Sequence, residues 1–225
     1  MDRVLSASDE SGFFNGCLVI VVSNYVSRTK SVEMSLEAPL TRLGLARYDI
    51  HIVIDAPPDT DARAIEGQHV FFVESCHRLR ALGEGHYQIV YEGEPEDKEG
   101  FVSWAEKCVE FFKLMQFNIG MVCVDYADFR TVLQYCKGRT LRFEWLPYDQ
   151  YDVVPYSKHR GSAYRTLYCC ICGGADSSLQ QYVEFSEVLE AENPNLVMTK
   201  AAMTIGRYDP PVMMLLGEID ESIVA

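Results

Sequence analysis

The stretch GMVCVDYADFRTVL, residues 120–133, places two aspartates three positions apart, after a glycine and before an apolar run with helical spacing. Asp128 is expected to cap a helix over residues 129–136, which leaves Asp125 as a solvated acid of the preceding loop. A functional role for either carboxylate is compatible with this local role. The spacing alone does not decide between the two interpretations.

The segment before this stretch is a strong helix candidate. Between residues 101 and 117, apolar side chains cover more of a helical surface than a helix at the protein surface needs. We therefore expect a central helix over 101–118, buried between two layers or two subdomains. Its apolar positions are Phe101, Trp104, Ala105, Cys108, Val109, Phe111, Phe112 and Met115.

Residues 1–100 read as a partial α/β subdomain. CLVIVV (17–22) and IHIVIDA (50–56) are apolar runs typical of strands buried on both faces. A helix is predicted between them over 27–43, and this strand–helix–strand order favours parallel pairing. The stripe of the helix is Val32, Leu36, Leu40 and Leu43, with a break at Pro39, and further strands are expected at 69–73 and 87–91 without an assigned pairing.

The turn-rich, acidic stretch 92–100 marks the main boundary, and residues 119–225 form the second domain. This part is predicted to be a four-stranded sheet with two helices, so the overall class is α/β to α+β. Its strands are expected at 140–146, 164–172, 196–205 and 211–219, and its helices at 128–136 and after the capping residues Ser177 and Ser178.

Acidic residues outnumber basic ones by 33 to 20, which gives a net charge of −13. Such a surface repels nucleic acids and anionic lipids, so neither is an expected partner. No secretory signal and no apolar run of the roughly 20 residues that a transmembrane helix requires can be recognised, which favours a cytoplasmic protein. Cys169 and Cys172 have zinc-ligand spacing, but a strand would point them to opposite faces, so no metal site is expected.

The stretch 120–133 resembles the synergy loop and following helix of FtsZ, the bacterial tubulin-like division GTPase. The family pattern is roughly GLMNVDFADVRTVM, and it aligns without a gap. Residues 164–190 and 196–219 also resemble the family's C-terminal domain, and the helix 101–117 occupies the place of its central helix. Identical positions in the loop and helix are Gly120, Val124, Asp125, Ala127, Asp128, Arg130, Thr131 and Val132.

The resemblance implies a truncated tubulin/FtsZ-like fold and a site that acts in trans. In that family the loop aspartates enter the nucleotide pocket of the next subunit, where they help to activate the water that attacks the γ-phosphate. Asp125 and Asp128 would be those carboxylates, while Cys123 stands where the family has an asparagine. The implied interface residues are Gly120, Cys123, Asp125, Asp128 and Arg130.

The family's glycine-rich phosphate cradle of the GGGTGTG type has no counterpart, and Gly173-Gly174 is the only Gly-Gly pair in the chain. We therefore expect no bound cofactor and no GTPase activity from this chain alone. The leading hypothesis is a protein that contacts an FtsZ- or tubulin-like subunit, or a second copy of itself, and caps or regulates a filament. A structural subunit of an unrelated complex, or an enzyme with a pocket between the two halves, remain alternatives.

Overall fold

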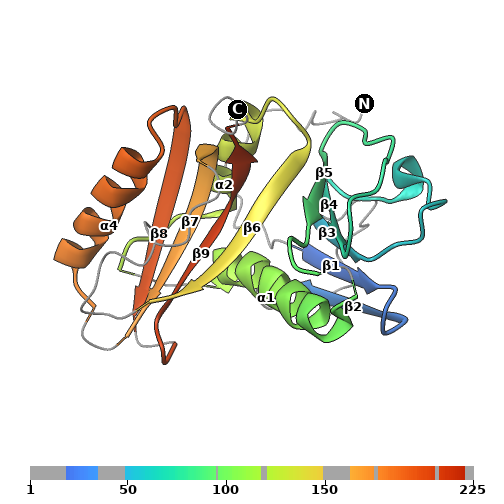
Figure 1. Ribbon diagram of the computed structural model, residues 1–225, viewed down its shortest axis with the longest axis horizontal. Coiled ribbons are helices and arrows are strands. Elements are labelled where there is room, and N and C mark those ends of the chain that lie inside the picture. Colours follow the sequence, from blue (N-terminus) through green and yellow to red (C-terminus); the bar gives the residue numbers. More distant parts are fainter. Residues whose placement is uncertain are drawn as a thin grey trace, which may run out of the picture.

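The computed structural model describes residues 19–34, 49–94, 96–117, 121–148, 163–174, 177–205 and 208–220. In this part of the chain nine strands form one mixed sheet in the order β2-β1-β3-β4-β5-β6-β9-β7-β8 (Figure 1). The strands are β1 Val19–Asn24, β2 Thr29–Met34, β3 Ile50–Ile54, β4 His69–Glu74, β5 His86–Val90, β6 Thr140–Pro147, β7 Tyr164–Gly173, β8 Met198–Ile205 and β9 Val212–Ile219. The helices are α1 Lys98–Phe117, α2 Tyr126–Tyr135, α4 Leu179–Glu192 and the short 3-10 helix η2 Ala62–Ala64.

The N-terminal strands β1, β3, β4 and β5 are parallel, which confirms the predicted parallel pairing of the first two apolar runs. β3 is buried at all five positions, because side chains of both its faces are covered. The strands predicted at 69–73 and 87–91 exist and also run parallel, so they do not form a hairpin. All the carboxyl ends of these strands consequently lie at one edge of the sheet, and all the amino ends lie at the other.

The helix predicted over residues 27–43 is wrong in the part that the structure describes. Thr29–Met34 form β2, which pairs antiparallel with β1. The Asn24 side chain accepts hydrogen bonds from the N–H groups of Val26 and Ser27, and Arg28 adopts a positive φ of 55°. This tight turn reverses the chain before a helix can begin. Residues 35–43 lie outside the described residues.

Strand β6 belongs to both parts of the sheet. Its first residues, Thr140 and Leu141, pair parallel with β5, and the segment 142–147 pairs antiparallel with β9. The C-terminal part is therefore the four-stranded unit β6-β9-β7-β8 with helices α2 and α4, as predicted. β8 and β9 do not pair with each other, since β7 lies between them. The division into domains at residues 100 and 118 stays a prediction.

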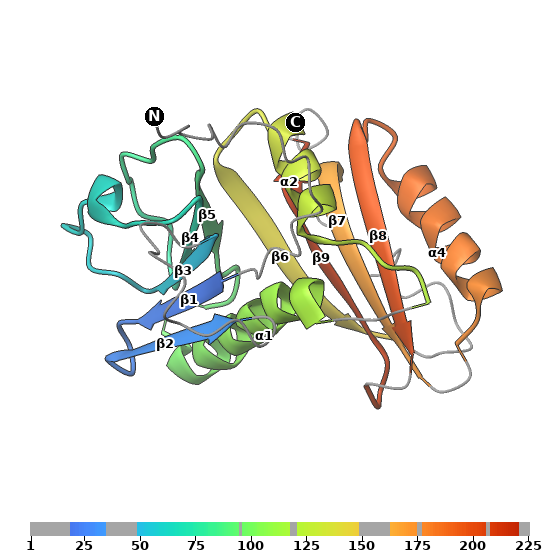
Figure 2. The same cartoon turned by 180° about the vertical axis from the view of Figure 1, so that it is seen from behind.

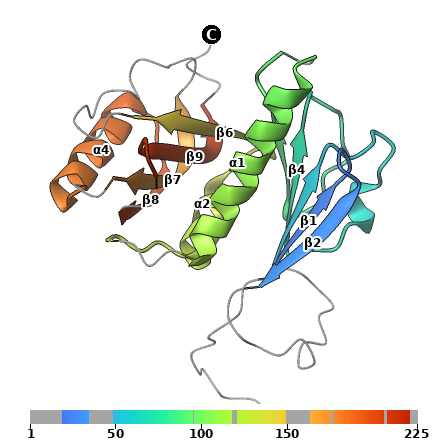
Figure 3. The ribbon, with the colours of Figure 1, turned by 90° about the horizontal axis from the view of Figure 1, so that it is seen from below.

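Helix α1 lies between the N-terminal and the C-terminal strands (Figure 3). Phe112 packs on Phe71 of β4 with ring centroids 4.6 Å apart, and Phe111 contacts Tyr168 of β7 at 5.6 Å. Phe129 of α2 touches both Phe71 and Tyr168, so the core is continuous across both halves. The predicted burial of the helix is confirmed. In the described part of the chain, no helix has the length and apolar character that crossing a bilayer requires.

The far face of the C-terminal strands is covered by α4, which lies outside β8 (Figure 2). Ser178 caps this helix and accepts a hydrogen bond from the N–H of Gln181. Cys169 packs into the core under α4, whereas Cys172 packs into the core around α1. The two thiols thus lie on opposite faces of β7, as the strand geometry predicts.

Candidate functional site: the α1–α2 loop and the two edges of the N-terminal strands

The loop between α1 and α2 is held in place by the C-terminal strands. Val122 and Met203 of β8 exchange two backbone hydrogen bonds of 3.2 and 3.0 Å. The buried Tyr168 of β7 donates its hydroxyl hydrogen bond to the carbonyl of Val124 at 3.1 Å. Both contacts fix the backbone directly before Asp125. Gly120, the first residue of the predicted interface, lies outside the described residues.

Asp125, and not Asp128, is the N-cap of α2. Its Oδ1 accepts hydrogen bonds from the N–H groups of Ala127 at 2.8 Å and Asp128 at 3.1 Å. Asp128 accepts in turn from the N–H of Asp125 at 3.4 Å, which completes a capping box. The predicted cap was wrong because Asp125 has the extended backbone that a cap requires, so the helix begins at Tyr126.

Both carboxylates face outward. Asp125 is exposed, and among the described residues its Oδ2 has no hydrogen-bond or ion-pair partner. Asp128, whose side chain is 35% exposed, lies 2.9 Å from Nζ of Lys200 on β8. This hydrogen bond raises the pKa of Lys200. Sequence reasoning missed Lys200, although it is the only charged residue in the strand MTKAAMTI.

A groove of about 450 Å³ separates the loop from α4. Cys123 and Asp128 line it on the loop side, and Lys200 lies in its β8 wall. We call the surface formed by Cys123, Asp125, Asp128 and Lys200 the loop face.

Arg130 does not join the loop face. Two positions apart on a helix, Asp128 and Arg130 point in different directions, and Arg130 lies near His69 at the start of β4. Its charge, after the larger effect of burial, contributes to lowering the pKa of His69 to about 4. The ion pair of Asp128 is with Lys200, and Arg130 is exposed, which is the ordinary state of an arginine on a helix surface.

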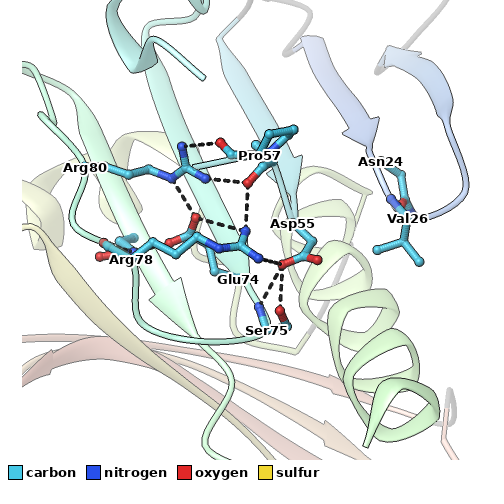
Figure 4. Close-up of polar contacts among 10 residues, drawn as sticks. Asn24, Val26, Asp55, Pro57, Glu74, Ser75, Arg78 and Arg80 are labelled. Atoms are coloured by element: carbon cyan, nitrogen blue, oxygen red, sulfur yellow. Dashed lines mark hydrogen bonds and ion pairs between the residues drawn. The ribbon is translucent and has the colours of Figure 1, made fainter. Parts of the chain in front are cut away.

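At the carboxyl ends of β3 and β4, two acidic and two basic side chains pair with one another in an ion-pair network (Figure 4). Glu74 is fully buried and lies 2.6 Å from Nε of Arg80, whose side chain is 1% exposed. Arg80 also donates to the carbonyls of Ala56 and Pro57. Asp55 binds Arg78 at 2.8 Å. In parallel α/β sheets ligands usually bind at this edge, but here the protein's own side chains occupy it.

The amino ends of the same strands carry three histidines that are far apart in sequence. His51, His69 and His86 stand at the first or second positions of β3, β4 and β5. His69 Nδ1 is hydrogen-bonded to the hydroxyl of Tyr126, which donates to the carbonyl of Asp49 at 3.1 Å. The hydroxyl of Tyr126 thus links the ring of His69 to the backbone before β3. The sequence signal was a histidine at or just before each of three predicted strands.

Beside these histidines a cavity of about 1040 Å³ lies between the two halves of the molecule. Its walls come from the segments 63–69 and 84–87 on one side, and from α2 and the segment after it on the other. We call it the amino-edge cavity. Sequence reasoning left open a pocket between the halves but named no residue for it.

Neither a protein-family model nor a curated protein matches this chain in sequence. Among solved structures, CetZ from Methanosaeta thermophila strain DSM 6194 is similar, with a TM-score of 0.51 at 11% identity over 80% of this chain and 64% of that chain. FtsZ of M. jannaschii is similar as a W319Y mutant (TM-score 0.45, 13% identity, 76% of this chain and 56% of that chain) and as an empty dimer (0.45, 15%, 77% and 55%).

This chain therefore spans less than two thirds of the length of the proteins it resembles. At this level of identity the CetZ match concerns the architecture only. The chain has a tubulin/FtsZ-like fold.

Proposed function

We propose that this protein acts through protein–protein contacts, by docking its loop face on the phosphate-holding face of an FtsZ- or tubulin-like subunit. The partner is another protein of this fold or a second copy of the chain. A subunit that offers the loop face without a working nucleotide site would cap or regulate a filament rather than extend it.

The observation that carries the proposal is the outward carboxylate of Asp125. One oxygen is used to cap α2, and the other has no partner among the described residues. A cap fixes the direction of the carboxylate, because both N–H donors belong to the rigid first turn of the helix. Asp125 is thus preorganised to present negative charge to a water or cation held by another molecule.

The closed network at the carboxyl edge supports the absence of a nucleotide site in this chain. A phosphate group placed there would have to break the ion pair between Glu74 and Arg80, both of which are almost inaccessible to solvent. The sequence also lacks a glycine-rich cradle for phosphates. We expect no phosphate release from GTP by the purified chain.

Co-sedimentation with GTP-assembled FtsZ filaments tests the proposal. The native chain should pellet with the filaments or shorten them. The variant Asp125→Asn/Asp128→Asn removes both charges and keeps the capping oxygens, since asparagine caps helices as well as aspartate does. We expect it to stay in the supernatant while its helix content is unchanged.

The matched control is Glu94→Gln/Glu96→Gln, which removes two exposed negative charges before the start of α1. These residues are separated from the loop by the 20 residues of α1, about 30 Å of helix. The control should pellet like the native chain. Native protein that leaves filament length and sedimentation unchanged would refute the proposal, and a stable complex insensitive to both variants would favour a structural role elsewhere.

A further inference from the structure

The amino-edge cavity has a charge that contrasts with the rest of the protein. Four cationic side chains and two anionic ones line it, whereas the whole chain carries a net charge of −13. Among the described residues none of the four cations takes part in an ion pair. The four cations are Arg63, Arg130, Lys137 and Arg139, and the acids are Glu66 and Glu84.

The cations that line the cavity come from both halves of the molecule. Arg63 belongs to η2, Arg130 lies on α2, and Lys137 follows that helix. The guanidinium of Arg139 lies 5.5 Å from the ring centre of Tyr87 on β5, which restricts its position. Only the tertiary fold brings these charges together, and within the described ranges no acidic side chain lies at ion-pair distance from them.

His86, one of the lining residues, also carries a buried polar atom that does not open into the cavity in this structure. His86 is 8% exposed, and its Nδ1 has no hydrogen-bond partner in the part of the chain that the structure describes. A buried polar atom that is left unpaired destabilises the fold by about 1–3 kcal/mol, so such atoms are rare and usually mark a site or a missing partner. Burial, and then the charge of Arg139, lower the pKa of His86. An anion bound nearby would raise this pKa again.

We propose that the amino-edge cavity binds a small organic polyanion, whose phosphate or carboxylate groups pair with the four cations. Guanidinium groups match both kinds of anion with paired hydrogen bonds. A volume of about 1040 Å³ is at the upper end for small-molecule sites and is far larger than one inorganic ion needs. The ligand binds between the halves, and the cavity shares helix α2 with the loop face but none of its residues, so variants of the two sites can be tested separately.

Titration calorimetry of the full chain in low-salt buffer tests the site with two probes, tripolyphosphate and citrate. At least one of them should bind. Binding of tripolyphosphate alone identifies the ligand groups as phosphates, binding of citrate alone identifies carboxylates, and binding of both supports a general polyanion site.

The variant Arg63→Gln/Lys137→Gln removes one cation from each wall and should weaken binding at least tenfold. Its charge-matched control is Arg28→Gln/Lys98→Gln, at the opposite edge of the N-terminal strands, which should weaken binding less than twofold. In NMR spectra the imidazole signals of His86 should shift on addition of the probe to the native chain. The proposal is overturned if neither probe binds, or if the cavity variant and the control bind equally well.

Discussion

The two edges of the N-terminal strands differ in how their charges are satisfied. At the carboxyl edge, Glu74 and Arg80 neutralise each other inside the protein. At the amino edge, four cations face a cavity with no ion-pair partner among the described residues. The contrast teaches that a sheet edge of an α/β fold is not a binding site by position alone. It becomes one where the protein leaves charge and polar atoms unsatisfied.

The largest effect is expected from breaking the closed edge. Arg80→Met leaves Glu74 as a buried carboxylate without its main counter-ion, which should lower the free energy of unfolding by about 3–5 kcal/mol in urea titrations. Glu74→Gln/Arg80→Met removes both charges and should be more stable than Arg80→Met. If Arg80→Met lowered the free energy of unfolding by less than about 1 kcal/mol, the ion pair between Glu74 and Arg80 would not be the main charge compensation at the carboxyl edge.

A smaller effect should appear at the amino edge on acidification. The pKa of His69 is about 4 in the folded protein and 6.5 in the unfolded chain, so the unfolded chain takes up the proton first as the pH falls. The contribution of His69 to the free energy of unfolding is therefore fully present above pH 6.5, and it is lost as the pH falls from 6.5 to 4.

His69→Gln should reduce this loss by roughly 1–2 kcal/mol, less than the full shift implies because the imidazole is partly exposed. Urea titrations of both proteins at pH 7 and pH 4.5 measure the difference. Equal losses in the two proteins would show that His69 is not buried as a neutral ring.

Asp125 represents an intermediate case, an exposed charge satisfied by backbone N–H groups. Asp125→Ala should destabilise the protein by about 1 kcal/mol through the lost cap, and Asp125→Asn by only a few tenths of a kcal/mol. Thermal unfolding followed by circular dichroism compares the two. A loss of equal size in both variants would mean that the charge, rather than the cap, stabilises α2.

The smallest effect is expected for the open edge. Arg63→Gln/Lys137→Gln should change the free energy of unfolding by no more than about 0.5 kcal/mol, because both side chains are exposed and unpaired among the described residues. Urea titrations of this variant and of Arg80→Met, carried out under the same conditions, compare the free energy of unfolding that the charges of each edge contribute. A decrease of several kcal/mol in the free energy of unfolding would mean that these two cations stabilise the fold and are not reserved for ligand binding.

Most strands and the central helix could be predicted from the pattern of apolar residues. The run HVFFV predicted β4 correctly, since burial on both faces leaves a continuous apolar run, and the wide apolar surface of 101–117 predicted the position of α1 between the two halves. The segment after Asn24 was misjudged, because a turn held by one side chain outweighed a helical stripe. Asp125 was misplaced as a plain loop acid, because aspartates three residues apart fit two helix starts equally well.

The apolar strands, the central helix and an acidic loop before α2 could be predicted from the sequence, because these features depend on residues that are neighbours along the chain. Tertiary structure alone decided that Lys200 pairs with Asp128, that Glu74 and Arg80 close one edge, and that cations from two halves meet at the other. Charges interact over a few ångströms of space, so Asp128 and Lys200, and the cations of the two halves, become neighbours only when the sheet and α1 bring distant segments together. Glu74 and Arg80 are close in sequence, and their contact depends on the path of the chain after β4.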